Sequence, residues 1–187
     1  MVIIYEKKWQ EGDLFFDFSK ADSVIKLDGP DHGLSHLRIK SVDFVVEWPD
    51  GYWLIEVKDP ENSQIPEEKK ISEKCAFLKK LQSKYLFEDL HVKFMDSLFY
   101  LSLDQGIPKK PLYYFILIGI SHLKPSMLKV LTQEMLAHHE CLKGPKRGWS
   151  KGFSIAIFNL AAWRKHLPRC PVTRSGLNHS VLDQNRI

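Results

Sequence analysis

Two short apolar segments separated by Pro49-Asp50-Gly51 are the feature that most limits how this chain can fold. The first runs from Val42 to Trp48 and the second from Tyr52 to Val57, and both are rich in the β-branched and aromatic residues that favour strands. Proline, aspartate and glycine between them are typical of a tight turn. The sequence therefore predicts a β-hairpin. Because nearly every residue of the hairpin is apolar, we expect it to be buried on both faces.

Three charged residues lie near the ends of this hairpin. Asp43 stands near the start of the first segment, and Glu56 and Lys58 end the second. Side chains alternate between the two faces of a strand, so Glu56 and Lys58 point the same way, roughly 7 Å apart. Charges within a buried sheet need a reason such as a metal ion or catalysis. The alternative interpretation is a solvated cross-strand pair of the kind found in half-exposed strands.

The register of the hairpin decides whether Asp43 joins the other two charges. A two-residue turn at Asp50-Gly51 sets Asp43 opposite Lys58, on the shared face. A three-residue loop at Pro49-Asp50-Gly51 sets it opposite Val57, on the other face, unless a β-bulge restores the phase. The turn residues permit both arrangements, so the sequence leaves the register open.

The pattern Asp43, then Glu56-Val57-Lys58, resembles the Asp…Glu-x-Lys signature of the PD-(D/E)XK superfamily, the restriction-endonuclease-like nucleases. The motif covers residues 42 to 59, and the order of the predicted elements extends the resemblance to about residue 158. The fold that it implies is α/β: a restriction-endonuclease-like α/β/α core with a mixed central sheet and a motif-bearing β-hairpin.

Two features depart from the family pattern. Val42 stands where the family name has a proline. The acidic residue that members often carry on a preceding helix has no clear match, and Asp28 and Glu6 are the candidates to replace it.

The resemblance implies a nuclease that hydrolyses phosphodiester bonds with Mg²⁺ or Mn²⁺, with DNA as the expected substrate. Asp43 and Glu56 would hold one or two ions, and the backbone carbonyl of Val57 would complete the metal site. Lys58 would position the attacking water and stabilise the charge that builds on the phosphate. Neighbouring carboxylates keep a lysine charged, which favours this electrostatic role over that of a general base. Glu47, on the Asp43 face, is interpreted as an exposed residue near the turn rather than as an accessory acid.

A second candidate site is the segment from Lys143 to Gly152, which holds four positive charges and one tryptophan. Basic side chains neutralise phosphates, and an indole stacks on an unpaired base. The candidate nucleic-acid-binding residues are Lys146, Arg147, Trp149 and Lys151. The alternative is an ordinary surface loop whose tryptophan folds back onto the core.

The remaining elements follow from hydrophobic periodicity and from turn signals. Helix, strand, helix and strand after a strand hairpin form an α/β order. The expected elements are short strands, or a strand and a turn, at 13–18 and 23–27; the motif hairpin at 37–58; a helix from about 67 into the eighties; a helical or mixed piece at 88–103; strands at 111–119 and 153–158; and helices at 125–140 and 161–166.

Length and composition agree with one globular domain. Of 187 residues, 44% are hydrophobic and 27% charged, and the net charge of +4 is compatible with a nucleic-acid partner but too small to argue for one. We expect residues 1–168 to form a single nuclease-like domain and residues 169–187 a mobile or docked C-terminal extension. Three cysteines without metal-ligand spacing, no secretory signal and no long apolar run predict a cytoplasmic protein that does not bind membranes.

A second function class competes with the nuclease: a non-catalytic nucleic-acid- or protein-binding module that retains the nuclease fold. The missing upstream acid favours the module, and the intact Asp43, Glu56 and Lys58 set favours the nuclease. A coincidental motif in an interaction protein is the third interpretation. The sequence contains no evident target-recognition region, so specificity would come from the structure of the nucleic acid, a homodimer or a partner protein.

Overall fold

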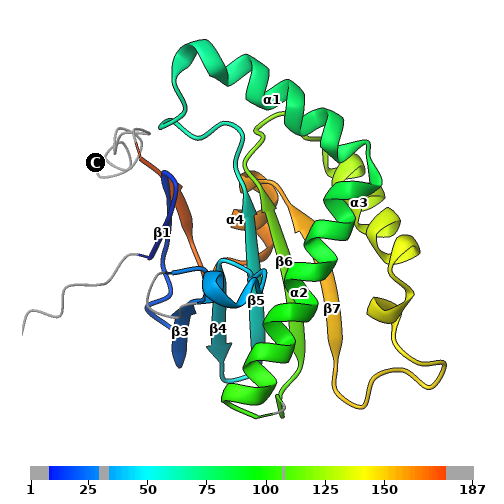
Figure 1. Cartoon of the computed structure of the whole chain (residues 1–187). Coiled ribbons are helices and arrows are strands. Elements are labelled where there is room, and N and C mark those ends of the chain that lie inside the picture. Colours follow the sequence, from blue (N-terminus) through cyan, green and yellow to red (C-terminus); the bar gives the residue numbers. More distant parts are fainter. Residues whose placement is uncertain (1–8, 30–33, 107, 176–187) are drawn as a thin grey trace, which may run out of the picture.

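The computed structural model describes residues 9–29, 34–106 and 108–175. Its centre is a mixed five-stranded sheet with helices on both faces (Figure 1). The strands lie in the order β3-β4-β5-β6-β7. They are β3 Ser23–Lys26, β4 Phe44–Trp48, β5 Gly51–Lys58, β6 Leu112–Ile118 and β7 Phe153–Phe158.

Strand direction changes in the middle of the sheet. The strands β3, β4 and β5 are antiparallel neighbours, whereas β5, β6 and β7 run parallel. Parallel neighbours require crossover connections, and helices supply them between β5 and β6 and between β6 and β7. The carboxyl ends of β5 and β6 therefore lie at the same edge of the sheet.

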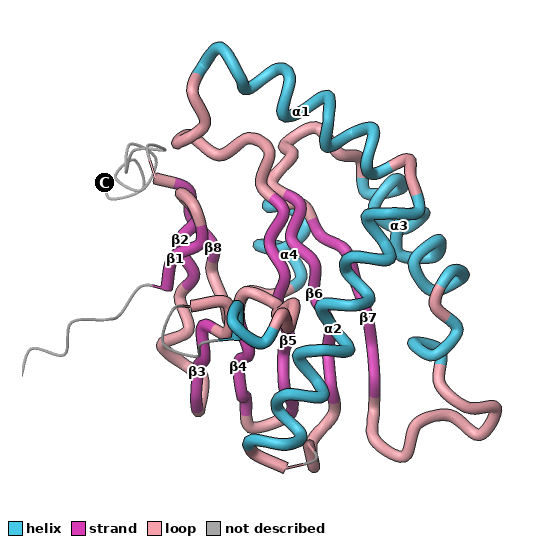
Figure 2. Tube along the Cα trace, in the orientation of Figure 1, coloured by secondary structure: helices cyan, strands magenta, loops and turns pink. Residues whose placement is uncertain are grey.

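Three helices cover one face of the sheet, and the fourth lies on the other (Figure 2). Acidic residues open α1 and lysines close it, which suits the helix dipole. The helices are α1 Glu67–Leu81, α2 Lys84–Asp104, α3 Pro125–His138 and α4 Leu160–His166, with 3₁₀ turns at Leu34–Leu37 and Glu140–Lys143. Within the described residues, no helix is both long enough and apolar enough to cross a membrane.

A small antiparallel sheet in the order β1-β2-β8 packs against the face that carries α4. It is formed by β1 Trp9–Glu11, β2 Leu14–Phe16 and β8 Val172–Arg174. The first part of the expected C-terminal extension is thus docked through β8, and residues 176–187 lie outside the described residues. The Arg174 guanidinium donates to Asp13 and Asp59 at 2.7 to 2.9 Å, which ties the small sheet to the end of β5.

Burial of the central strands on both faces creates two apolar cores. On the α1–α3 face, Val45, Leu54 and Ile116 pack against Leu86 and Leu90 of α2. On the other face, Phe44, Trp53, Phe115 and the small sheet surround Trp163 of α4. The prediction that the hairpin is buried on both faces is confirmed, since every residue of β4 except Glu47 is buried.

The hairpin has neither of the registers expected from the sequence. Trp48 pairs with Gly51, so the two turn residues are Pro49 and Asp50. The reason lies outside the hairpin. A Cβ on Gly51 would come within 2.8 Å of the Pro111 carbonyl oxygen and 2.7 Å of the Tyr113 ring, so Gly51 serves the close approach of β6 and not the turn.

The same register decides the face of the first motif residue. Counting from the pair Phe44–Ile55 places Asp43 opposite Glu56, not opposite Lys58 or Val57. The predicted start of the hairpin at residue 37 is also wrong, because β4 begins at Phe44 and a 3₁₀ turn occupies 34–37.

Replacing Gly51 with alanine tests this explanation of the register. We expect Gly51→Ala to lower the free energy of unfolding by about 1–3 kcal/mol, because the new methyl group meets backbone that cannot move aside. Urea denaturation measures the loss. Gly152→Ala is the matched control, since its Cβ would lie 3.4 Å from Pro111, an ordinary contact. Equal stability of the two variants would contradict the explanation.

Candidate metal centre at the end of the motif hairpin

The three motif residues come together beneath α2. Asp43 directly precedes β4, and Glu56 and Lys58 are among the last three residues of β5. They share the face of Val45 and Leu54, which pack into the core with α2. Asp43 is 5% exposed and Glu56 is fully buried. The structure therefore places two carboxylates opposite each other inside the protein, with a lysine beside the second.

A side chain, not a carbonyl group, ends the ladder between β4 and β5. The Val57 N–H donates to Asp43 Oδ2 at 2.6 Å. The backbone just before it has turned toward α2, where the Val42 N–H donates to Ser97 Oγ at 2.9 Å. The Asp43 carbonyl accepts from the Leu27 N–H at 2.9 Å. These bonds hold the Asp43 carboxylate at the point where β4 begins.

The Val57 carbonyl faces the same space as the Asp43 side chain. Backbone groups of successive strand residues point alternately to the two neighbouring strands. Lys58 faces β6, since its carbonyl accepts from Gly119 N–H, and Val57 faces β4. Because β4 starts only at Phe44, the Val57 carbonyl points past the end of that strand.

Glu56 is only half satisfied. Its Oε1 accepts a hydrogen bond from Lys93 Nζ at 2.7 Å and forms an ion pair with Lys58 Nζ, also at 2.7 Å. Its Oε2 is buried and has no hydrogen-bond partner among the described residues. A buried carboxylate oxygen without a partner is unfavourable, and a cation removes the penalty. This oxygen is the strongest local indication that the site takes an additional positive group.

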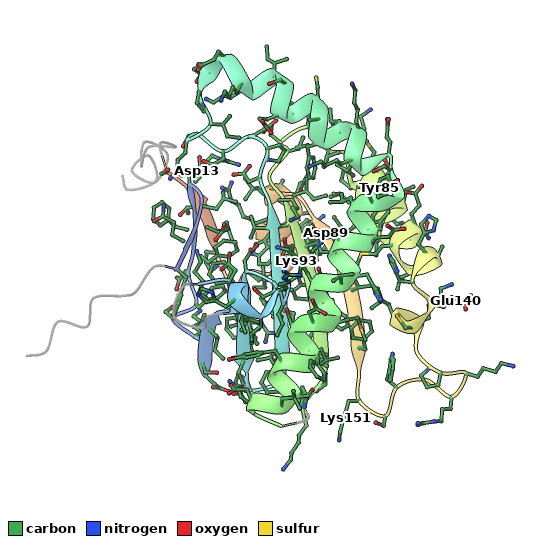
Figure 3. All side chains as sticks on the ribbon, viewed as in Figure 1. Asp13, Tyr85, Asp89, Lys93, Glu140 and Lys151 are labelled. Carbon is green, nitrogen blue, oxygen red and sulfur yellow. The ribbon has the colours of Figure 1, made fainter. Side chains whose placement is uncertain are left out.

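Two residues of α2 complete the polar surroundings of the motif. Asp89 and Lys93 are one helical turn apart, and Figure 3 places both over the middle of the sheet. Asp89 lies 2.7 Å from Lys40 Nζ and 3.9 Å from Lys58 Nζ. Sequence reasoning did not identify Lys93. The available signal was a lysine on the helix face that also carries the buried residues Leu90 and Phe94.

The charge of Lys93 follows from its neighbours. Burial works to lower the pKa of this lysine, but the negative charges of Glu56 and Asp43 outweigh burial, and its pKa is raised. Lys93 is therefore an ammonium group in this arrangement. It neutralises Glu56 from the helix side while Lys58 does so from the strand.

Asp28 and Glu11 approach Asp43 from the side of β3 and β1. One carboxylate oxygen of each of these three residues lies within 4.8 Å of the other two. Glu11 also pairs with Lys26 at 2.8 Å. Asp28 was one of the two candidates for the missing upstream acid, and the structure brings it to the motif. The other candidate, Glu6, lies outside the described residues.

Crowded carboxylates shift the proton affinity of the site. Burial, followed by the charge of Glu56, holds the pKa of Asp43 well above its ordinary value. Burial and the charge of Glu11 likewise raise the pKa of Asp28. The larger shift, at the buried Asp43, means that a negative charge is unfavourable there unless a cation is added.

The donor set fits a hard divalent cation. Asp43, the free Oε2 of Glu56 and the Val57 carbonyl are oxygen donors, and Asp28 and Glu11 extend the acidic set. Magnesium and manganese favour carboxylate and carbonyl oxygens and leave positions for water and phosphate. The oxygen donors therefore favour Mg²⁺ or Mn²⁺ over softer metal ions.

The predicted nucleic-acid-binding residues lie elsewhere. Lys146, Arg147, Trp149 and Lys151 precede β7, whose first residue pairs with the first residue of β6. Glu56 and Lys58 pair with the carboxyl half of β6, so the loop and the motif lie toward opposite ends of the strands. Glu47 lies near the hairpin turn and pairs with Lys110 at 2.7 Å, apart from the metal centre.

Comparison with known proteins yields no relative. No family model matches the chain, and no curated protein or solved structure matches it at a significant level. What the site does is therefore argued from its geometry and chemistry.

The raised pKa of Asp43 predicts an unusual pH dependence in metal-free protein. An aspartate in the unfolded chain loses its proton at about pH 4, whereas Asp43 in the folded protein keeps its proton up to a higher pH. Between these two pKa values the folded state therefore binds one more proton than the unfolded state. Stability contributed by Asp43 therefore falls as the pH rises through this window. We expect the unfolding free energy of wild type in EDTA, minus that of Asp43→Asn, to decrease with pH, and added Mg²⁺ to reduce this slope.

Glu47→Gln supplies a control for which the stability difference from wild type should change with pH in the opposite direction. The hydrogen bond from Lys110 lowers the pKa of Glu47, so its contribution to stability is lost as the pH falls. Thermal or urea unfolding across the acid-to-neutral range measures both difference curves. A flat curve for Asp43→Asn would contradict the assignment of a destabilising buried carboxylate.

Proposed function

We propose that the protein is a nuclease that hydrolyses phosphodiester bonds, in the first place those of DNA, with Mg²⁺ or Mn²⁺. The observation that carries the proposal is the pairing of Asp43 opposite Glu56, with an unpartnered carboxylate oxygen and Lys58 at the same point. Two hard oxygen ligands beside a fixed ammonium group suit metal-assisted attack on a phosphate.

The architecture supports placing the fold among the restriction-endonuclease-like α/β/α cores. A motif hairpin is followed by helices and then by a strand parallel to the second hairpin strand. Helices lie on both faces of a mixed sheet. The nuclease family whose motif resembles Asp43…Glu56-Val57-Lys58 is expected to have this same order of elements. The motif and the topology therefore support the same proposal.

Asp43, Glu56 Oε2 and the Val57 carbonyl would hold the ion, and Asp28 and Glu11 would adjust the charge around it. A bound divalent ion supplies Lewis-acid polarisation of the phosphate and lowers the pKa of a bound water. The burial of Asp43 and Glu56 keeps bulk water from the ligands, which strengthens their interaction with a cation.

Lys58 acts electrostatically in this scheme. Its ammonium is held 2.7 Å from Glu56 Oε1 and is still partly exposed at the end of β5. It can donate to the attacking water or to a phosphate oxygen on which charge develops. Lys93 also contacts Glu56 Oε1. When Lys58 turns toward the substrate, this second contact keeps Glu56 in its orientation. The next residue, Asp59, is fixed by Arg174, which holds the end of the strand in place.

Cleavage assays with matched variants test the proposal. We expect wild type to cleave plasmid or single-stranded DNA with Mg²⁺ or Mn²⁺, and Asp43→Asn and Glu56→Gln to lose both metal binding by calorimetry and activity. Lys58→Met should retain metal binding but cleave at least about 100-fold more slowly, because it removes only transition-state stabilisation. Glu47→Gln, an acid on the same strand face, should behave as wild type.

Two results would overturn the nuclease assignment. Metal binding without cleavage of any nucleic acid would leave a metal site of other purpose. Binding of nucleic acid without metal binding or cleavage would favour the binding module instead.

The Lys93 ammonium contacts Glu56 Oε1 and leaves Oε2 for the ion, so it affects metal affinity through charge repulsion. We expect Lys93→Met to bind Mn²⁺ more tightly, by roughly tenfold, since one like charge is removed from a buried site. Lys93→Arg should keep the wild-type affinity because it keeps the charge. Lys40→Met is the control, as Lys40 pairs with the outlying Asp89. Calorimetric titration measures all three, and weaker binding by Lys93→Met would contradict this charge repulsion.

A further inference from the structure

An apolar groove of about 350 Å³ lies at the far end of α2 from α1, between this helix and the loop that leads into β7. Phe94, Leu98, Leu142 and Phe153 form apolar parts of its lining. Trp149 and Lys151 belong to its rim and come from the loop. The volume lies within the range of ordinary ligand sites. The motif residues have no part in it.

Trp149 is held in place but remains available. Its indole lies against Gly144, where an added Cβ would come within 2.5 Å of Nε1, and Gly144 has a φ of +81°. The backbone therefore supports the ring through a conformation that a larger residue rarely adopts. The side chain nevertheless stays 53% exposed. A large ring that is supported yet exposed beside a groove is a platform for stacking.

Four cations lie within the segment from Lys143 to Gly152, and one of them, Lys151, belongs to the groove lining. Lys143, Lys146, Arg147 and Lys151 are exposed and form no ion pair among the described residues. No aspartate or glutamate occurs in the sequence between Glu140 and Asp183. This contrasts with Lys26, Lys58 and Lys93, each of which pairs with a carboxylate. The positive charge of this segment is thus free to neutralise an anionic ligand that enters the groove.

We propose that this groove binds a single-stranded segment of nucleic acid, with a base against Trp149 and its phosphates against the four cations. A polyanion with planar aromatic groups satisfies both the charge and the exposed ring. An unpaired base can reach the indole, whereas bases within a duplex are covered by their neighbours. The proposal rests on the proposed function for its biological setting, but the groove binds whether or not the metal centre cleaves.

The distance between the groove and the metal centre indicates which kind of nucleic acid could occupy both. Phe153, in its lining, pairs with Leu112, and Leu112 pairs with Tyr52. Glu56 lies four residues farther along β5, or roughly 13 Å at the rise of a strand. Figure 3 likewise separates Lys151, at the lower end of the molecule, from Asp89 and Lys93. The segment held in the groove is therefore not the one cut, and the substrate is a nucleic acid with a single-stranded part beside the scissile bond.

Binding in EDTA separates this proposal from catalysis. Fluorescence anisotropy would follow a labelled oligothymidylate and a duplex of equal length titrated with the full-length protein. We expect single strands to bind more tightly than the duplex, and Trp149→Ala to weaken their binding roughly tenfold. Trp149→Phe should retain most of the affinity because it retains a ring. Lys146→Ala combined with Arg147→Ala should weaken binding and flatten its salt dependence.

A matched control comes from α1. Lys79→Ala combined with Lys80→Ala removes two exposed lysines far from the groove and should leave the affinity unchanged. Wild-type affinity in Trp149→Ala, or duplex binding as tight as that of single strands, would overturn the proposal. Binding of acidic peptides or anionic vesicles but not of oligonucleotides would overturn it as well.

The two proposals fail in different ways. If Trp149→Ala binds normally while Asp43→Asn abolishes cleavage, the groove assignment is wrong and the nuclease stands. If the groove variants lose binding but no metal-dependent cleavage occurs, the groove stands and the nuclease is wrong.

Discussion

The hydrogen bond from the Val57 N–H to Asp43 Oδ2 is the constraint on which the candidate site depends. It ends the antiparallel ladder with a carboxylate where a backbone carbonyl would otherwise stand. Asp43 is thereby held opposite Glu56, and the Val57 carbonyl points past the start of β4. One contact of 2.6 Å thus fixes the Asp43 carboxylate beside the end of β5, at the point where the pairing of β4 with β5 stops.

The centre so formed leaves one buried carboxylate oxygen, Glu56 Oε2, without a hydrogen-bond partner among the described residues. Glu56 is fully buried, and two lysines satisfy only one of its oxygens. The pKa of Asp43 is raised by burial and by Glu56, which indicates that the two carboxylates repel each other. Within a packed sheet such an arrangement is tolerated when a cation joins it. The proposed metal and the proposed activity both derive from this unpartnered oxygen and from the raised pKa of the neighbouring Asp43.

Helix α2 links the two regions to which we assign function. Its Lys93 and Asp89 face the motif, and its Phe94 and Leu98 line the groove beside Trp149. The parallel strands set the spacing between these regions, with the metal centre near the carboxyl end of β5 and the groove at the amino end of β7. Arg174 secures the strand end from the far terminus through Asp59 and Asp13, so residues distant in sequence stabilise the same point.

The sequence by itself determined the local elements and part of the site. Strand alternation places Glu56 and Lys58 on one face, and apolar periodicity locates the central strands and helices, because both signals arise within a few consecutive residues. Only the tertiary structure decided the register, since the close approach of β6 to Gly51 selects a turn that the Pro49-Asp50-Gly51 chemistry does not specify. It alone brought Lys93 and Arg174 to the motif and chose Asp28 from the two candidate acids, because contacts between residues so far apart leave no periodic trace in the chain.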